Sequence, residues 1–317
     1  MNRFFFILIG VLGFVSWAQA DPPPRPVPAI HKVLIISVDG LRPDLLLRGN
    51  TPVLHAMLPK SCFTFWARTT DLAITLPSHT SMLTGVAPEK HGITWNSDPP
   101  QVIYPKVPTI FQLAKKAGYT TAMVAGKSKF AALALPGSLD QSFVPHETAV
   151  KDERVCEEAL KVLSNGKPDL FFVHFPEPDV MAHQRGWGSR EHMEVIARTD
   201  RCIGELLAKI DPASTVVLIT ADHGGAGYTH GANDPRSAHI PWIIQGPGIQ
   251  EGMDLTLYAS RTIRTEDTFV TICFLLGIPL PEGIDGKPVT QILDDLQLNP
   301  QKYPAPPSPK FGKPSGQ

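Results

Sequence analysis

The 317-residue sequence lacks an excess of charge of either sign. It has 29 Lys and Arg residues against 30 Asp and Glu residues, which gives a formal net charge of -1. Proteins that bind nucleic acid normally carry a basic excess to meet the phosphates, so this balance disfavours that class. A small phosphorylated substrate needs only local positive charge and stays compatible with the composition.

Long apolar runs are also scarce. Beyond residue 20, no segment of the sequence is long and apolar enough to cross a membrane. The first twenty residues contain Arg3, an apolar run from Phe4 to Trp17, and Ala18-Gln19-Ala20. This order of charge, apolar run and small residues predicts a signal peptide over residues 1–20 and a mature protein exported to a periplasm or the medium. An uncleaved anchor is the alternative.

Cysteine is scarce too, with four residues and no C-x-x-C spacing, so a thiolate metal site is not expected. Cysteines of an exported protein meet an oxidising compartment. Cys156 and Cys202 both fall in helix-like segments and are the favoured disulfide pair. Four buried free thiols are the alternative.

Proline is concentrated at the two ends of the chain. Of 32 prolines, eleven lie in residues 22–28 and 300–314, so we expect an extended leader over residues 21–30 and an extended tail over 299–317. The intervening residues, 31–298, show no internal repeat and are expected to form one catalytic domain.

Between these ends, short apolar runs alternate with helical patterns. Strands are expected over 31–38, 120–124, 169–175, 214–220 and 240–244, and helices over 107–117, 152–163, 191–210 and 265–276. In the last strand, Pro241 indicates an edge or entry position. Strands that are apolar on both faces and separated by helices predict an α/β fold, a three-layer α/β/α sandwich with a largely parallel sheet.

Polar residues follow three of the expected strands. Asp39 follows the first, Asp179 and His183 follow the strand that ends at Phe175, and Asp222 and His223 follow the strand that ends at Thr220. Parallel sheets place their chemistry beyond the carboxyl ends of the strands. Carboxylates and imidazoles gathered there predict a metal site with oxygen and nitrogen ligands. His230 and His239 lie downstream, and either one completes the set.

Five motifs of the chain, in this order, resemble those of the alkaline phosphatase superfamily, and most closely its nucleotide pyrophosphatase/phosphodiesterase branch. They are VLIISVDGLRPD (33–44), TLPSHTSMLTGVAPEKHGI (75–93), EPDVMAH (177–183), TADHGG (220–225), and HG (230–231) followed by IPWIIQGPGI (240–249). The resemblance implies an alkaline-phosphatase-like fold and two divalent metal ions, most commonly Zn²⁺, with Mn²⁺ as the alternative.

The resemblance also implies roles for particular residues. One ion takes Asp39, Asp222 and His223, and the other takes Asp179, His183 and His230, with His239 as the alternative sixth ligand. Thr75 matches the nucleophile that bridges the ions, and Asn96 matches an asparagine that hydrogen-bonds a phosphoryl oxygen. Lys127 and Lys129 resemble substrate-binding lysines of some relatives, although a solvated loop explains them equally well. Thr75 also suits the N-cap of a helix that starts near Leu76.

The expected function is cleavage of phosphodiester or pyrophosphate bonds in a small phosphate ester through Thr75 and a covalent phospho-enzyme. An alcohol is a poor nucleophile at neutral pH, and a dication lowers its pKa. Phosphomonoester, phosphonoacetate-type and phospholipase-C-like hydrolysis are alternatives on the same site, and a binding module without turnover is another. Sulfatase activity is disfavoured, because threonine at position 75 cannot yield formylglycine and His79 stands where that signature has arginine.

Overall fold

A computed structural model describes residues 25–232, 234–257 and 262–293 of the chain. The expected signal peptide, the first residues of the expected leader and the expected proline-rich tail lie outside the described residues. Residues 25–30, part of the expected extended leader, instead form a turn that buries Val27 and Ile30 in the core. In the described ranges, no helix has both the length and the apolar character that a membrane span requires.

One mixed sheet organises the described residues. Its strand order is β4-β3-β5-β1-β6-β7-β2-β8. The bounds along the chain are β1 (Lys32–Val38), β2 (Cys62–Arg68), β3 (Thr121–Ala125), β4 (Gln141–Phe143), β5 (Leu170–Phe175), β6 (Thr215–Thr220), β7 (His239–Gln245) and β8 (Met253–Asp254). Strands β4, β3, β5, β1 and β6 pair in parallel, whereas β7 runs antiparallel to both of its neighbours. The expectation of a largely parallel sheet is therefore confirmed.

The edge position expected for Pro241 was wrong, because its strand β7 lies between β6 and β2. The entry position holds on one side, since the ladder with β6 begins at Trp242, the residue after Pro241. The register between β2 and β7 shifts between Thr64 and Ala67, so β2 has one residue more than β7 opposite the proline. Such a bulge interrupts the ladder where proline has no N–H to donate, which is how an interior strand accommodates it.

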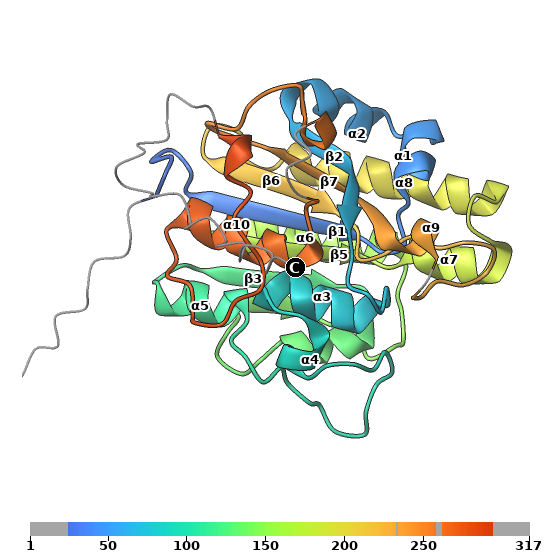
Figure 1. Ribbon diagram of the computed structural model, residues 1–317, viewed down its shortest axis with the longest axis horizontal. Coiled ribbons are helices and arrows are strands. Elements are labelled where there is room, and N and C mark those ends of the chain that lie inside the picture. The colour runs from blue at the N-terminus through green and yellow to red at the C-terminus, as the bar shows by residue number, and fades with distance from the viewer. Residues whose placement is uncertain (1–24, 233, 258–261, 294–317) are drawn as a thin grey trace, which may run out of the picture.

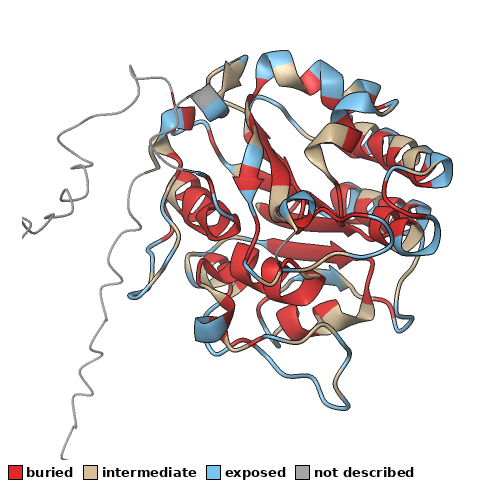
Figure 2. Cartoon of the chain, turned by 45° about the vertical axis from the view of Figure 1, so that its right-hand side comes forward, coloured by how far each residue is buried: buried red, intermediate tan, exposed pale blue. Residues whose placement is uncertain are grey.

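Helices cover both faces of the sheet (Figure 1). The four expected helices are present as α5 (Ile110–Lys116), α6 (Asp152–Asn165), α8 (Arg190–Leu207) and α10 (Thr265–Leu276). The further helices are α1 (Pro43–Arg48), α2 (Pro52–Met57), α3 (Thr75–Thr84), α4 (Pro88–His91), α7 (Glu177–Arg185) and α9 (Pro235–Ala238). Helix α3 packs on α10, and α6, α7 and α2 pack on α8. Figure 2 shows buried strands between helices that are themselves buried over much of their surface, and α3 and α10 are almost entirely buried.

The four cysteines are buried free thiols, so the favoured Cys156–Cys202 disulfide is absent. The two side chains are nevertheless neighbours, because the Cys156 thiol lies 3.9 Å from the carbonyl oxygen of Cys202 across the contact between α6 and α8. The structure thus has the free-thiol alternative.

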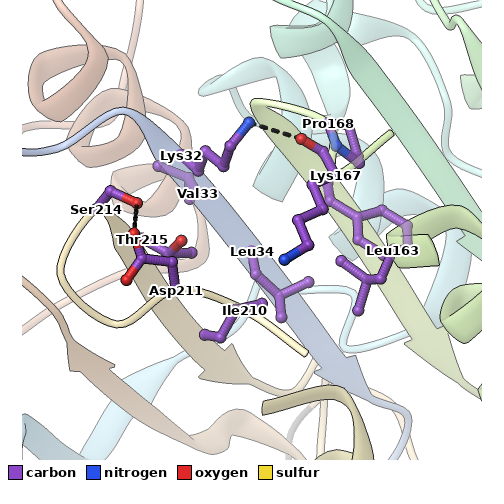
Figure 3. A pocket seen from close by; sticks show the side chains of 11 residues that line it. Lys32, Val33, Leu34, Leu163, Lys167, Pro168, Ile210, Asp211, Ser214 and Thr215 are labelled. Atoms are coloured by element: carbon purple, nitrogen blue, oxygen red, sulfur yellow. Dashed lines mark hydrogen bonds between the residues drawn. The ribbon is translucent and has the colours of Figure 1, made fainter. Parts of the chain in front are cut away.

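The two edges of the sheet differ in chemistry. At the amino ends of β1, β5 and β6, a cavity of about 240 Å³ is lined largely by apolar side chains such as Leu34, Leu163 and Ile210 (Figure 3). At the carboxyl ends, polar side chains gather instead. In the described residues, both groups of side chains that are arranged to hold a metal ion lie at this carboxyl edge.

Asp152, the first residue of α6, links the start of α6 to Glu177, the first residue of α7. Its buried carboxylate accepts hydrogen bonds from the Glu177 backbone N–H (3.0 Å) and the Thr199 hydroxyl (2.5 Å), and its own N–H donates to the Glu177 side chain (3.1 Å). Burial raises the pKa of Asp152 to about 7 despite these bonds. The folded protein therefore binds a proton at Asp152 more tightly than the unfolded chain does.

The Asp152→Asn variant should be more stable than the parent protein at pH 8 and equally stable at pH 4. The pKa of Asp152 is higher in the folded protein than in the unfolded chain, so the protonated carboxyl stabilises the fold fully below the unfolded-state pKa of 3.8. This contribution to the free energy of unfolding is lost as the pH rises through about 7. The amide removes that loss, which is on the order of a few kcal/mol, or roughly 5 °C or more in Tm. Thr199 can still donate to the Val195 carbonyl. Thermal unfolding of both chelated proteins from pH 4 to 8 tests this, and a pH-independent difference in Tm would contradict it.

Candidate active site

The strand and helix ends bring the predicted residues together at the carboxyl edge of the sheet. Asp39 directly follows β1, and its N–H donates to the carbonyl oxygen of Phe175 at the end of β5 (3.0 Å). Asp179 and His183 lie on α7, which begins directly after β5, while Asp222 and His223 follow β6. Because β5, β1 and β6 are adjacent and parallel, all these side chains lie in one place.

Asp39, Asp222 and His223 form the first ligand group. Nε2 of His223 lies 3.4 Å from Oδ1 of Asp39 and 3.2 Å from Oδ2 of Asp222. The three side chains are fully buried. The Gly40 N–H donates to the other Asp222 oxygen (3.1 Å). The ligand atoms lie within 4.8 Å of one another, a spacing at which one ion can contact all three.

The predicted second ligand group is Asp179, His183 and His230. The structure brings Asp179 and His230 together with His223 at ligand-atom spacings within 4.8 Å, and His183 is not a member of that group. Oδ1 of Asp179 lies 3.3 Å from Nε2 of His183 and 3.6 Å from Nε2 of His230. The His230 ring stacks on the His223 ring with centroids 3.7 Å apart, so the two groups adjoin. His239 is not part of either group, because its ring stacks on Trp66 with centroids 4.1 Å apart. The structure thus places His230, and not His239, beside the predicted ligands.

The histidine side chains present the nitrogen that a metal needs. Nδ1 of His183 contacts the Tyr228 carbonyl oxygen (2.9 Å), Nδ1 of His223 contacts that of Gly224 (2.8 Å), and Nδ1 of His230 contacts that of Ala73 (2.8 Å). A carbonyl oxygen can only accept, so each Nδ1 must carry the proton. Each Nε2 is left with a lone pair that faces the carboxylates, which is the usual arrangement of metal-ligating histidines.

The carboxylates also fit a metal. Oδ1 of Asp39, Oδ1 of Asp179 and Oδ2 of Asp222 are buried and have no hydrogen-bond partner. Buried polar atoms are almost always paired, and the cost of leaving a charged oxygen unpaired is high. Three such oxygens beside three available imidazole nitrogens match the oxygen and nitrogen donors that Zn²⁺ and Mn²⁺ accept.

Asp39 has a second set of partners. Its Oδ2 accepts from Nε2–H of His174 (3.0 Å) and from the Lys127 ammonium (2.7 Å). Burial by itself raises the pKa of Asp39, but Lys127 and then His174 more than offset this and hold the pKa well below its usual range. His174 was missed in the sequence. The signal was a histidine inside the otherwise apolar strand β5, because a buried imidazole must find a partner.

Thr75 is the first residue of α3 rather than its N-cap, which is Ile74, so the capping interpretation was wrong. The Thr75 hydroxyl lies 3.5 Å from Nε2 of His223, at the nitrogen that faces the first ligand group. Asn96 contacts the residue that follows Thr75, because its side-chain oxygen accepts a hydrogen bond from the Leu76 N–H (3.0 Å). Lys129 donates to the same oxygen (3.2 Å) and so holds Asn96 in place.

His79 links the start of α3 to strand β1. Its Nδ1 donates to the Thr75 carbonyl oxygen (2.8 Å), and its Nε2 lies 2.8 Å from the Ser37 hydroxyl on β1. Burial, and then the neighbouring His174, lower the pKa of His79 well below its usual value, so this imidazole is neutral. In the sequence His79 was noted only as a replacement for an arginine, and its supporting role was missed.

The sequence model described as type I phosphodiesterase/nucleotide pyrophosphatase matches residues 33–235, which include all of these side chains. The chain belongs to this family. The residues matched run from the start of β1 to the start of α9, so they contain both ligand groups and Thr75.

Three comparisons place the chain within the family's wider relationships. It is 32% identical over 146 residues to the 2,3-bisphosphoglycerate-independent phosphoglycerate mutase of Synechococcus elongatus, covering 43% of this chain and 26% of the mutase. It is 27% identical over 235 residues to bis(5'-adenosyl)-triphosphatase ENPP4 of Pongo abelii, covering 68% of this chain and 50% of that protein. The solved structure of inactive murine ectonucleotide pyrophosphatase/phosphodiesterase 5 with AMP aligns with a TM-score of 0.68 at 16% identity, covering 83% of this chain and 100% of the other.

The structural alignment confirms the alkaline-phosphatase-like fold. The chain spans between a quarter and a half of the length of the two curated relatives.

This family member has a recess beside its ligand groups. The recess has a volume of about 450 Å³ and lies between residues 68–73 and the segments that flank α9. Ala73 lines it, and its carbonyl oxygen holds His230. The buried hydroxyl of Thr70, which also lines the recess, has no hydrogen-bond partner. The recess therefore offers room next to His230, and the unpartnered Thr70 hydroxyl is buried in its wall.

Proposed function

We propose that the chain is an exported two-metal phosphohydrolase that cleaves phosphodiester or pyrophosphate bonds, with Thr75 as the nucleophile. One observation carries the proposal. The Thr75 hydroxyl lies 3.5 Å from the imidazole nitrogen of His223, where two adjoining ligand groups present three unpartnered carboxylate oxygens. An alcohol placed beside two cation positions is suited to attack on phosphorus. Export rests on residues 1–20, which lie outside the described residues, and stays a prediction.

Each residue of the site has a separate role in the proposed phosphoryl transfer. The two ligand groups would hold Zn²⁺ or Mn²⁺, whose positive charge lowers the pKa of a nearby alcohol and neutralises phosphoryl oxygens. Oγ1 of Thr75 gives its proton to water and bonds to phosphorus, while the P–O bond to the leaving group breaks and the leaving oxygen takes up a proton from water. The Asn96 amide donates to a phosphoryl oxygen, and the N-terminus of α3 adds partial positive charge. Water then cleaves the phosphothreonine and restores the hydroxyl.

Three findings favour a diester or pyrophosphate over a monoester. The family is that of type I phosphodiesterases and nucleotide pyrophosphatases. The curated relative ENPP4 is a bis(5'-adenosyl)-triphosphatase, which cleaves a compound with groups on both sides of the reacting phosphate. The recess of about 450 Å³ provides a place for such a second group next to the second ligand group.

A substrate panel tests the proposal. We expect the zinc-loaded protein to hydrolyse bis-p-nitrophenyl phosphate with a kcat/KM at least about tenfold above that for p-nitrophenyl phosphate, phosphonoacetate or p-nitrophenyl sulfate, a difference of about 1.4 kcal/mol in the barrier. Diadenosine triphosphate serves as a larger substrate with groups on both sides. Dominant hydrolysis of the monoester, the phosphonate or the sulfate would move the enzyme to another substrate class.

A further inference from the structure

A lysine ammonium lies between the two ligand groups. Lys127 follows β3 and is only 5% exposed. Its Nζ lies 2.7 Å from Oδ2 of Asp39 in the first group and 2.7 Å from Oδ2 of Asp179 in the second. Burial alone lowers the pKa of Lys127, but the two carboxylates outweigh burial and raise it, so the ammonium stays charged. Both Oδ2 atoms are therefore occupied by one fixed cation.

The other oxygen of each carboxylate is left for a metal. Oδ1 of Asp39 and Oδ1 of Asp179 are the buried, unpartnered atoms. The former faces His223 (3.4 Å), and the latter faces His183 (3.3 Å). The division is the same in both ligand groups, with Oδ2 on the ammonium and Oδ1 toward the imidazole nitrogens. A carboxylate held at one oxygen cannot turn freely, so the orientation of the other oxygen is set as well.

The backbone around Lys127 is itself held close to both groups. A side chain at Gly126 would collide with the ring of Pro176, because a Cβ there would lie 2.3 Å from Cδ of that ring. The Gly126 N–H also donates to Nδ1 of His174 (3.3 Å), the residue whose other nitrogen donates to Asp39. Lys127 thus starts from a segment that is packed against the residue preceding α7, the helix that carries Asp179.

We propose that Lys127 is a positioning residue shared by both metal sites, whose ammonium holds Asp39 and Asp179 so that one oxygen of each faces its metal. The inference rests on the proposed function only in taking the two groups as metal sites. It assigns Lys127 to the ligand carboxylates rather than to the substrate. The opposing idea is that the ammonium competes with metal ions for the same carboxylates.

Zinc affinity separates these two ideas, because they predict opposite signs. In Lys127→Met both carboxylates lose their anchor, and we expect zinc to bind about 10- to 100-fold more weakly, the usual effect of losing a partner of a ligand. Competition with a chromophoric chelator gives the affinity, and elemental analysis gives the number of ions bound per chain. The chelated variant should also unfold at a lower temperature, because two buried carboxylates lose a counter-charge.

Lys32→Met is the matched control. Lys32 makes a 2.9 Å ion pair with Asp169 at the amino edge of the sheet, away from the ligands, so this variant should keep the parental zinc affinity. Should Lys127→Met not fold without metal, Lys127→Gln, which keeps one donor, is judged by the same criterion. Zinc binding equal to or tighter than that of the parent protein would overturn the proposal. The assay contains no substrate. A parent protein that hydrolyses none of the substrate panel, together with weakened zinc binding in Lys127→Met, would therefore refute the proposed function and leave this inference standing.

Discussion

Replacing Thr75 by alanine is expected to reduce hydrolysis of bis-p-nitrophenyl phosphate by on the order of 10⁴-fold or more, the scale seen when a nucleophile is removed. The change deletes the hydroxyl that lies 3.5 Å from Nε2 of His223 and leaves the six predicted ligands in place. Bound zinc per chain should therefore stay at the parental value. Initial rates and elemental analysis on the same preparation measure both quantities.

Thr75→Ser is the control for this experiment, because it keeps an alcohol at the first residue of α3 while removing a methyl group. It should retain much more activity than the alanine variant. Activity of Thr75→Ala within tenfold of the parent would show that water attacks the substrate directly and that Thr75 is not the nucleophile. Loss of zinc in the alanine variant would instead point to a structural effect on the ligand groups.

Removal of divalent ions is the second change with a large expected effect. Chelation should lower the rate by at least about 10³-fold, because it takes away the charge that stabilises both attacking and leaving oxygens. Zn²⁺ or Mn²⁺ added in excess should restore the rate. The folded state should also lose stability on chelation, since Asp39, Asp179 and Asp222 would each retain an unpaired buried oxygen. A rate that is unchanged after complete removal of metal would contradict the proposed chemistry.

His230 and His239 offer a matched pair of variants for the same measurement. His230→Ala removes a nitrogen 3.6 Å from Asp179 and should lower the number of bound ions and the rate together. His239→Ala removes a ring that stacks on Trp66 and should leave both nearly unchanged. The reverse result would assign the sixth ligand to His239.

Much of the central sheet could be predicted because its strands are short apolar runs, and all five expected strands lie next to one another as β3, β5, β1, β6 and β7. The positions of Asp39, Asp179 and Asp222 followed from the same pattern, since each comes just after such a strand. In contrast, β2 (Cys62–Arg68) is not a continuous apolar run: buried and less buried residues alternate along it, and the alternation shifts at the bulge between Thr64 and Ala67. Its place in the sheet depends on pairing with β7, which lies far along the chain.

The supporting residues of the site were less predictable, for a related reason. The predicted ligands carry recognisable motifs, but the roles of Lys127, His174 and His79 depend on contacts made only in the folded chain. Nothing local to residue 127 indicates that its ammonium reaches the carboxylates of Asp39 and Asp179. The sequence left two interpretations of Lys127 open, a substrate-binding lysine by resemblance and a solvated loop. The structure excludes the solvated loop, because it buries Lys127 against these two predicted ligands.

The placement of α3 has a consequence for the order in which the chain can assemble during synthesis. The strands that carry the predicted ligands, β1, β5 and β6, and the loop with His230 are all complete before β7 is made. The helix that presents Thr75 is fastened later, because Gly85 at its end fits against Phe269 of α10 and its carbonyl oxygen accepts from the N–H groups of Asp285 and Gly286. In a nascent chain the predicted ligands can thus come together before the Thr75 hydroxyl is held in position. Residues 265–286, rather than the ligand edge, complete the alignment of Thr75.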